Sequence, residues 1–478
     1  MSKIAPAHSP RLLVLSAVLL AVLTGCQSGS IRSAQVLMRT GRVHEARDEL
    51  DAMARDGFPQ AHAILGWLEL GTALRETGAY APSSRAFLHA EEGFDAEDRR
   101  PQTSITEEMW AAATSPIAVD YRGAPTDRVL APTYRGINSL LLGDPDAART
   151  AFNEAAIRQD QTLELRRKRI EAAREVRSRP AYADRIDVGR SVDLVEHDPD
   201  LAARFASLEQ FRPYRDYVNP FAELVHAVFR LGAGEDAADA DRAVALLRSV
   251  AGMVPENGAV QQTLADAEAA AAGTPEAGVT HVFFATGFGP WRESFRVDLP
   301  LFLVNDEVDY VGVSFPVLTF DDRYVDLLRV ESPDEIVGTS VVADMDRIVS
   351  VEFREELPVL ITRAVIGAAA KTAAAWGLNK ATEDDETLNA VVRLAAGLYM
   401  FSQNKADTRS WASLPKQFQY ARINTPPSGQ LYLSTPDGQS VPIRVPPDGV
   451  SLVFVRSTRP GVPLHVETVV LGGEVKPQ

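Results

Sequence analysis

The chain has almost no cysteine, since Cys26 is the only one among its 478 residues. A single thiol cannot close an internal disulfide or build a cysteine-rich zinc site. The eight histidines are scattered, and none lies at a metal-ligand spacing such as H-E-x-x-H. We therefore expect neither a metal site nor a cofactor, and a fold stabilised by its hydrophobic core alone.

Signatures of common catalytic sites are also missing. The sequence holds no G-x-S-x-G nucleophile elbow. The segment "GAAAKT" (367–372) lacks the glycine that precedes lysine in a phosphate-binding loop, and "GFGPWR" (287–292) has only two glycines of a dinucleotide fingerprint. We identify no catalytic residue and interpret the chain as a protein without enzymatic activity. A pair of carboxylates acting on a glycan would leave no such motif, so a peptidoglycan-active enzyme in the C-terminal half is the alternative.

Positive charge is scarce as well. The chain has 49 Lys and Arg against 65 Asp and Glu, a net charge of −16, which disfavours binding to nucleic acid. One basic stretch, residues 166–179, stands out in this acidic background. It fits either a contact with anionic lipid or the solvated face of one long helix that also carries Glu164 and Glu171. We favour the helix.

The N-terminus contains an apolar run that is too short to cross a membrane. Residues 12–23 are apolar apart from Ser16 and follow Lys3 and Arg11, whereas a spanning helix needs about 20 apolar residues. This arrangement is typical of an export signal, which we place at residues 1–25. The sequence Leu-Thr-Gly-Cys at 23–26 resembles the lipobox of bacterial lipoproteins. The resemblance implies cleavage before Cys26, lipidation of its thiol and a short anchored linker at 26–30. Gln27 in place of aspartate favours the periplasmic face of the outer membrane.

A helical repeat is predicted for residues 31–272. The segment "GWLELGTALRETGAYAPSSRAFLHAEEGF" (66–94) has the spacing of a tetratricopeptide repeat, in which glycines face large side chains between paired helices. Weaker copies surround Gly41, Gly143 and Pro255. We expect a tetratricopeptide-like α-solenoid, whose concave face would bind other cell-envelope proteins. Helical hairpins without a true repeat are the alternative.

A β-rich domain is predicted after the small, Pro- and Gly-containing stretch at 270–278. Short β-type runs recur from residue 279 to the C-terminus at 478, and "TPDG" (435–438) and "PPDG" (446–449) punctuate them. We expect a sandwich-like arrangement, or else a partly open barrel, interrupted at about 343–406 by a pair of helices. Pro358 is expected to kink or restart the first of these helices. The fold class is therefore α+β, with the solenoid first and the β-rich domain second.

Four segments together resemble a poorly characterised family of bacterial lipoproteins with tetratricopeptide-like repeats. They start at residues 121, 219, 287 and 405, and the most specific is the segment at 407–415, Asp-x-Arg-x-Trp-x-x-Leu-Pro. Genes of this family tend to lie beside lipoproteins that resemble activators of penicillin-binding proteins. The resemblance implies a scaffold or regulator in the cell envelope. Peptidoglycan synthesis and envelope assembly are the two processes in which it would act. An accessory role in outer-membrane protein assembly or secretion is a further alternative.

Five residues of these segments are candidates for contact with a ligand or partner, because arginine and tryptophan are frequent in recognition sites: Trp291, Arg292, Asp407, Arg409 and Trp411. The other interpretation of the last three is an ion pair and a core aromatic that together fix a turn.

Replacing Cys26 tests the anchor. The change Cys26→Ser removes the thiol that would carry the lipid, so we expect an uncleaved or soluble product in place of one that sediments with the outer membrane. Metabolic lipid labelling and membrane fractionation measure this. Unchanged labelling and sedimentation would contradict the predicted localisation.

Overall fold

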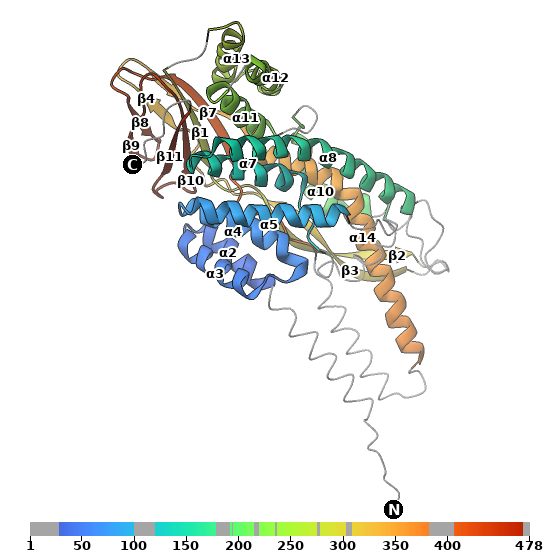
Figure 1. The fold of residues 1–478 in the computed structure, drawn as a ribbon. Helices are drawn as coiled ribbons and strands as arrows, with labels where there is room; N and C mark the ends of the chain where they lie inside the picture. Colours follow the sequence, from blue (N-terminus) through green and yellow to red (C-terminus); the bar gives the residue numbers. More distant parts are fainter. Residues whose placement is uncertain are drawn as a thin grey trace, which may run out of the picture.

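Helices dominate the N-terminal half of the chain and β-sheets the C-terminal part, so the fold is α+β (Figure 1). The computed structural model describes residues 28–99, 120–177, 192–193, 195–214, 219–234, 237–274, 278–302, 308–381 and 406–471. The helices are α2 (Ser28–Arg39), α3 (Val43–Asp56), α4 (Ala63–Glu76), α5 (Tyr80–Arg99), α7 (Pro125–Leu141), α8 (Pro145–Arg177), α10 (Pro199–Ala206), α11 (Pro220–Gly232), α12 (Ala237–Met253), α13 (Gly258–Ala271) and α14 (Met345–Ala381). Within these ranges, none of the helices combines the length and the apolar character that crossing a membrane requires.

The helices pack as hairpins in which glycine faces a phenylalanine. A side chain at Gly71 of α4 would lie 2.6 Å from the ring of Phe87 on α5, and one at Gly136 of α7 would lie 2.5 Å from Phe152 on α8. These glycines let the paired helices approach closely enough for the rings to fill the space between them. Gly143 has a φ of 76° at the turn between α7 and α8, where other residues are strained. Helical hairpins are thus present where the sequence predicted them, whereas the tetratricopeptide repeat stays a prediction.

The described strands form three sheets, which bring distant parts of the sequence together. Their bounds are β1 (Val279–Thr286), β2 (Trp291–Phe302), β3 (Val308–Thr319), β4 (Arg329–Glu331), β5 (Ile336–Gly338), β6 (Ser340–Asp344), β7 (Gln417–Asn424), β8 (Gln430–Ser434), β9 (Ser440–Arg444), β10 (Val450–Ser457) and β11 (His465–Leu471). The first sheet has the order β11-β10-β1-β7-β6, the second β5-β4-β8-β9, and β2 pairs with β3 in a ribbon. In the first sheet β1 and β10 are parallel, while the other neighbours are antiparallel.

The first sheet is buried on both faces. Alternate residues of β1 point to opposite sides: Phe283 packs against the helices, whereas Val282 and Phe284 pack against the second sheet. In β10, Phe454 faces the helices and Val455 the second sheet. The two sheets therefore pack as a sandwich, and helices cover the outer face of the first sheet.

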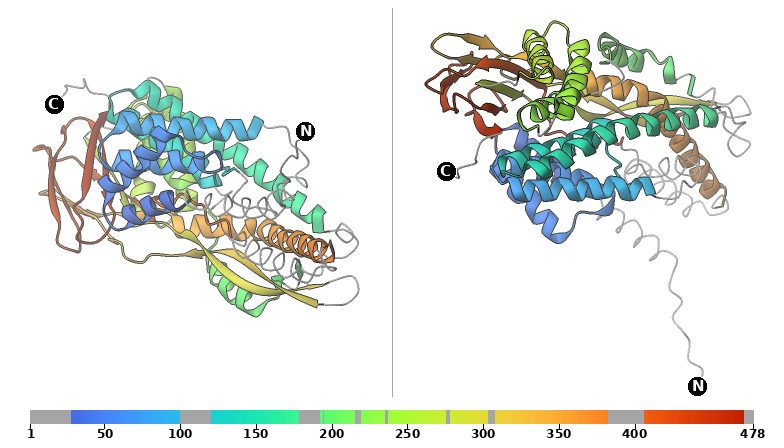
Figure 2. Two further views of the ribbon diagram at one scale, coloured as in Figure 1. Left: turned by 90° about the horizontal axis from the view of Figure 1, so that it is seen from below. Right: turned by 45° about the horizontal axis from the view of Figure 1, so that its top comes forward.

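The ribbon and α14 extend away from this sandwich, alongside α8 (Figures 1 and 2). Val313 and Phe315 of β3 are buried against Val359 and Val365 of α14. The helix continues through Pro358, whose carbonyl oxygen accepts a hydrogen bond from the Thr362 hydroxyl at 2.7 Å. The helix therefore does not restart at Pro358, whereas the kink stays a prediction.

The structure differs from the sequence-based expectation at three further places. Residues 28–30 belong to α2, so the predicted linker at 26–30 is shorter than expected. Strand β6 occupies residues at which the helical insertion was expected to begin. The turn at 435–438 joins the β8–β9 hairpin as predicted, but the one at 446–449 carries the chain from the second sheet into the first.

The predicted signal (1–25), Cys26 and most of the second inserted helix (385–406) lie outside the described residues.

The boundary at 270–278 falls between α13 and β1, yet one core spans both sides of it. Leu50, Phe87 and Leu247 of the helices belong to the same buried cluster as Tyr420 and Leu452 of the first sheet. The two parts of the chain differ in secondary structure but do not bury their apolar surfaces separately. This packing therefore does not support two domains that fold independently.

Cutting the chain at 275–277 tests the shared core. We expect the two pieces, expressed separately, to aggregate or to melt without cooperativity, because each would expose the apolar face that the other covers. Circular dichroism and calorimetry measure this, with the two pieces expressed together as the control. Two separate pieces that each melt cooperatively would show that the parts are independent.

Candidate functional site

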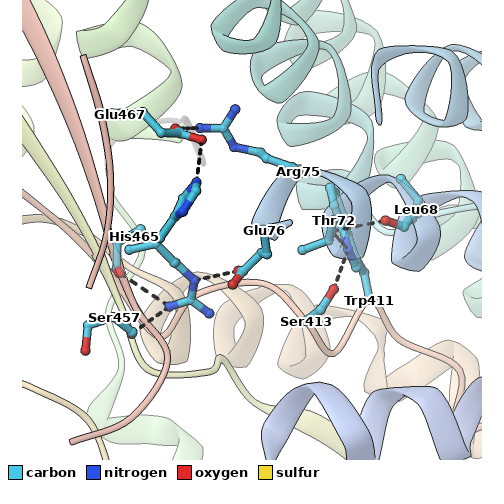
Figure 3. Close-up of polar contacts among 11 residues, drawn as sticks. Leu68, Thr72, Arg75, Glu76, Trp411, Ser413, Ser457, His465 and Glu467 are labelled. Carbon is cyan, nitrogen blue, oxygen red and sulfur yellow. Dashed lines mark hydrogen bonds and ion pairs between the residues drawn. The ribbon is translucent and has the colours of Figure 1, made fainter. Parts of the chain in front are cut away.

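The segment 406–416, called the interlayer segment below, lies between the helices and the first sheet. Its Trp411 is buried, with its ring centroid 5.8 Å from Phe87 of α5 and 5.9 Å from Tyr134 of α7. The indole Nε1 lies 2.9 Å from Thr72 Oγ1 and 3.0 Å from Ser413 Oγ (Figure 3). Trp411 is thus an internal aromatic anchor, as the second interpretation of the sequence had it.

Side chains of α2 and α4 hold the backbone of the interlayer segment. Glu69 Oε1 accepts hydrogen bonds from the Ala412 amide at 2.8 Å and from Gln35 Nε2 at 2.7 Å. Gln35 Nε2 also donates to the Ser410 carbonyl at 2.9 Å. Burial raises the pKa of Glu69, and its hydrogen bonds act in the opposite direction. The inner face of the helical hairpins, around Glu69 and Thr72, is therefore occupied by a segment of the same chain.

Three of the five sequence candidates meet at the start of this segment. Arg409 forms a partly buried ion pair with Asp407 at 2.7 Å and donates to the Ala61 carbonyl at 2.7 Å. Arg292 at the start of β2 pairs with Glu356 of α14 at 2.6 Å. Burial alone would raise the pKa of Asp407, but Arg409 and Arg292 hold it below the usual range. The electrostatic coupling of Asp407 to both arginines places these residues in one charged cluster.

The remaining candidate, Trp291, has different neighbours. It is half-buried at the start of β2, and the Arg39 guanidinium lies 4.4 Å from its ring centroid. Its Nε1 donates to Glu293 at 3.0 Å. The cation–π contact attaches the C-terminal end of α2 to the ribbon.

The sequence analysis missed two members of the charged cluster, Tyr121 and Asp127. Asp127 is buried in the first turn of α7, where its Oδ2 accepts from the Tyr121 hydroxyl at 2.5 Å and from the Ala124 amide at 2.8 Å. Burial raises the pKa of Asp127 to about 6, against these hydrogen bonds. A sequence signal for Asp127 was available: it is an acidic residue in the first turn of a helix that begins with proline, which is typical of a helix N-terminus.

A second cluster lies between α4 and the strands β10 and β11 (Figure 3). Arg75 of α4 pairs with Glu467 of β11, and Arg456 of β10 donates from Nε to Glu76 at 2.7 Å. His465 Nε2 lies 3.1 Å from the same Glu467 carboxylate. All of these side chains except His465 are mostly buried, so the two ion pairs join the helices to the sheet in a water-poor environment.

These two ion pairs line a cavity of about 50 Å³, called the interlayer cavity below. Its remaining wall is largely apolar and aromatic: Tyr134, Ile137, Phe221, Phe283, Ala285, Phe418, Phe454 and Val455. The Nη2 atom of Arg456 is buried and has no hydrogen-bond partner within the described part of the chain.

A third polar group lies at the start of α14. The buried Lys416 ammonium contacts Asp346 Oδ2 and lies 3.3 Å from Asp322 Oδ1. Burial raises the pKa of Asp346 to about 6. Over the ranges that the structure describes, no group of three His, Cys, Asp or Glu side chains is arranged to hold a metal ion.

Shortening Trp411 tests the anchor role. We expect Trp411→Ala to lower the free energy of unfolding by roughly 3–5 kcal/mol, because it leaves a cavity in the core. Trp411→Phe keeps an aromatic ring but removes the indole donor, so a smaller loss of about 1 kcal/mol is expected. Chemical denaturation measures both. If Trp411→Ala has no effect on stability, the interlayer segment does not hold the layers together.

The pH dependence of stability tests the environment of Asp127. Its pKa of about 6 in the folded protein lies above the value of about 3.9 for an unfolded chain. The folded state therefore binds this proton more tightly, and this carboxyl favours folding at low pH. As pH rises from about 4 to 6, its contribution falls by about 2 kcal/mol. Asp127→Asn should remove that fall, measured as the pH-dependent difference in unfolding free energy between the two proteins. A constant difference across this range would contradict the assigned environment.

Comparison with known proteins identifies no relative: no family model, no curated protein and no solved structure matches the chain.

Proposed function

We propose that this protein is a lipid-anchored scaffold or regulator that binds other cell-envelope proteins at the periplasmic face of the outer membrane. The lipobox-like sequence at 23–26 and the apolar run before it support the anchor. The observation that carries the proposal is the start of α2 at Ser28, two residues after Cys26. Ile31 and Met38 of this helix are buried in the main core.

The short connection has a mechanical consequence. A chain spans at most about 3.6 Å per residue, so an acylated Cys26 would hold α2 within about 10 Å of the lipid surface. Because α2 is part of the core, the whole body would be held there without a spacer. Other proteins of the same membrane would then contact the helices at a fixed distance from the lipid surface.

A partner would have to use the outer surface of the helices. The inner face around Thr72 and Glu69 is filled by the interlayer segment. On the outside, Leu88 of α5 and Ile157 of α8 are exposed large apolar side chains, 43% and 52% accessible. We place the partner contact on this outer face of the helical hairpins.

Affinity capture from detergent-solubilised envelope tests this function. We expect envelope proteins to co-purify with the native protein, and less so with Leu88→Glu or Ile157→Glu. The matched control is Tyr432→Glu, which alters a large side chain on the second sheet that is about as exposed as Leu88. No enrichment of envelope proteins, or equal loss in all three variants, would contradict the proposal.

A second candidate, a peptidoglycan-active enzyme, is favoured by one observation. Asp346, with its pKa raised to about 6, lies near the exposed Asp322 across Lys416. Two neighbouring carboxyl groups, one of them with a raised pKa, are the combination that glycoside hydrolysis uses. Release of soluble fragments from cell-wall sacculi, abolished by Asp346→Asn, would support this candidate and overturn the scaffold.

A further inference from the structure

The interlayer cavity has a lining in which the charges cancel. Arg75 faces Glu467 and Arg456 faces Glu76, so each guanidinium already has a carboxylate partner. Bringing another net charge into this buried place would cost desolvation energy without a free counter-charge to offset it. The cavity therefore favours a neutral occupant over an anion or a cation.

Arg456 determines which hydrogen-bonding group an occupant of the interlayer cavity must offer. Its Nε donates to Glu76 at 2.7 Å, and its Nη1 donates to the Ser457 carbonyl at 2.9 Å and the Ala285 carbonyl at 3.3 Å. Only Nη2 is left without an acceptor among the described residues, although Arg456 is 91% buried. A buried donor without a partner destabilises the fold, because it has lost its hydrogen bond to water. An occupant that offers an acceptor to Nη2 would remove this cost.

The size and the remaining wall limit the occupant further. A water molecule needs about 10–15 Å³ of such space, so about 50 Å³ accommodates a group of roughly four non-hydrogen atoms. Phe283, Phe454 and Ile137 line the same cavity and offer an apolar surface. A group with a carbonyl oxygen at one end and a methyl at the other matches both sides.

We infer that the interlayer cavity binds a neutral amide group with a small apolar end, an acetamido group in shape and chemistry. Its carbonyl oxygen accepts a hydrogen bond from Arg456 Nη2, and its methyl packs on Phe283 and Phe454. Such a group occurs in N-acetylated amino sugars and in N-acetylated peptides. Binding would join α4 to β10 more firmly, since the cavity lies between them.

Titration with small probes tests this site on the complete mature protein. Acetamide is the minimal probe, acetate tests the preference for a neutral group, and N-acetylglucosamine and N-acetylalanine amide distinguish the two sources. We expect saturable binding of acetamide by nuclear magnetic resonance, at least tenfold tighter than acetate. The larger probe that binds more tightly identifies the source.

Two variants connect this binding to the cavity. Ala285→Val fills part of the space and removes no polar group, and Arg456→Lys keeps the charge near Glu76 but removes Nη2. Each should weaken acetamide binding at least tenfold, while Ser440→Val, which adds the same side chain on an exposed strand, should leave it unchanged. The inference is overturned if acetamide does not saturate, if acetate binds equally well, or if correctly folded Ala285→Val binds as tightly as the native protein.

Discussion

The insertion of Trp411 between α4, α5 and α7 is the contact that joins the two parts of this chain. The indole fills a space between Phe87 and Tyr134, and its donor is satisfied by Thr72 and Ser413. Because Trp411 lies six residues before β7, the same short segment fixes the first sheet against the helices. The position of the sheet, and with it the interlayer cavity, depends on this insertion.

Buried charges reinforce that arrangement. Glu69 holds the backbone of the interlayer segment, and the pairs Arg75–Glu467 and Arg456–Glu76 connect α4 to strands β11 and β10. Such pairs contribute little net stability over apolar contacts, but separating one leaves a buried charge and is strongly destabilising. They therefore specify how the layers are aligned, while the apolar core supplies the stability.

Local features of the sequence predicted much of the secondary structure. The hairpin β8–β9 follows from alternating apolar residues around the turn at 435–438, and the glycine–phenylalanine spacing in α4 and α5 predicted their hairpin. Strands β4 and β5 were missed because each has only three residues, too few for an alternating pattern. The parallel pairing of β1 with β10 joins residues about 170 positions apart, which no local pattern reports.

The candidate site was predictable to a similar extent. The order Asp407, Arg409, Trp411 suggested either a recognition site or an internal ion pair with a core aromatic, and the structure shows the ion pair. Tyr121 and Glu69 carry no sequence signal, because a buried polar residue is recognised only through its partners. The Ala412 partner of Glu69 is 343 positions away in the sequence. Asp127, the partner of Tyr121, is only six positions away but belongs to the helix that follows.

The central claim is that the helices and the first sheet share one core, closed by Trp411. Native-state hydrogen exchange tests it most directly, because it measures the opening free energy of each amide. The most protected amides of α4 and α5 should open with the same free energy as those of β1 and β10, and Trp411→Phe should lower both sets equally. Two different maximal opening free energies, of which only one responds to Trp411→Phe, would contradict a shared core.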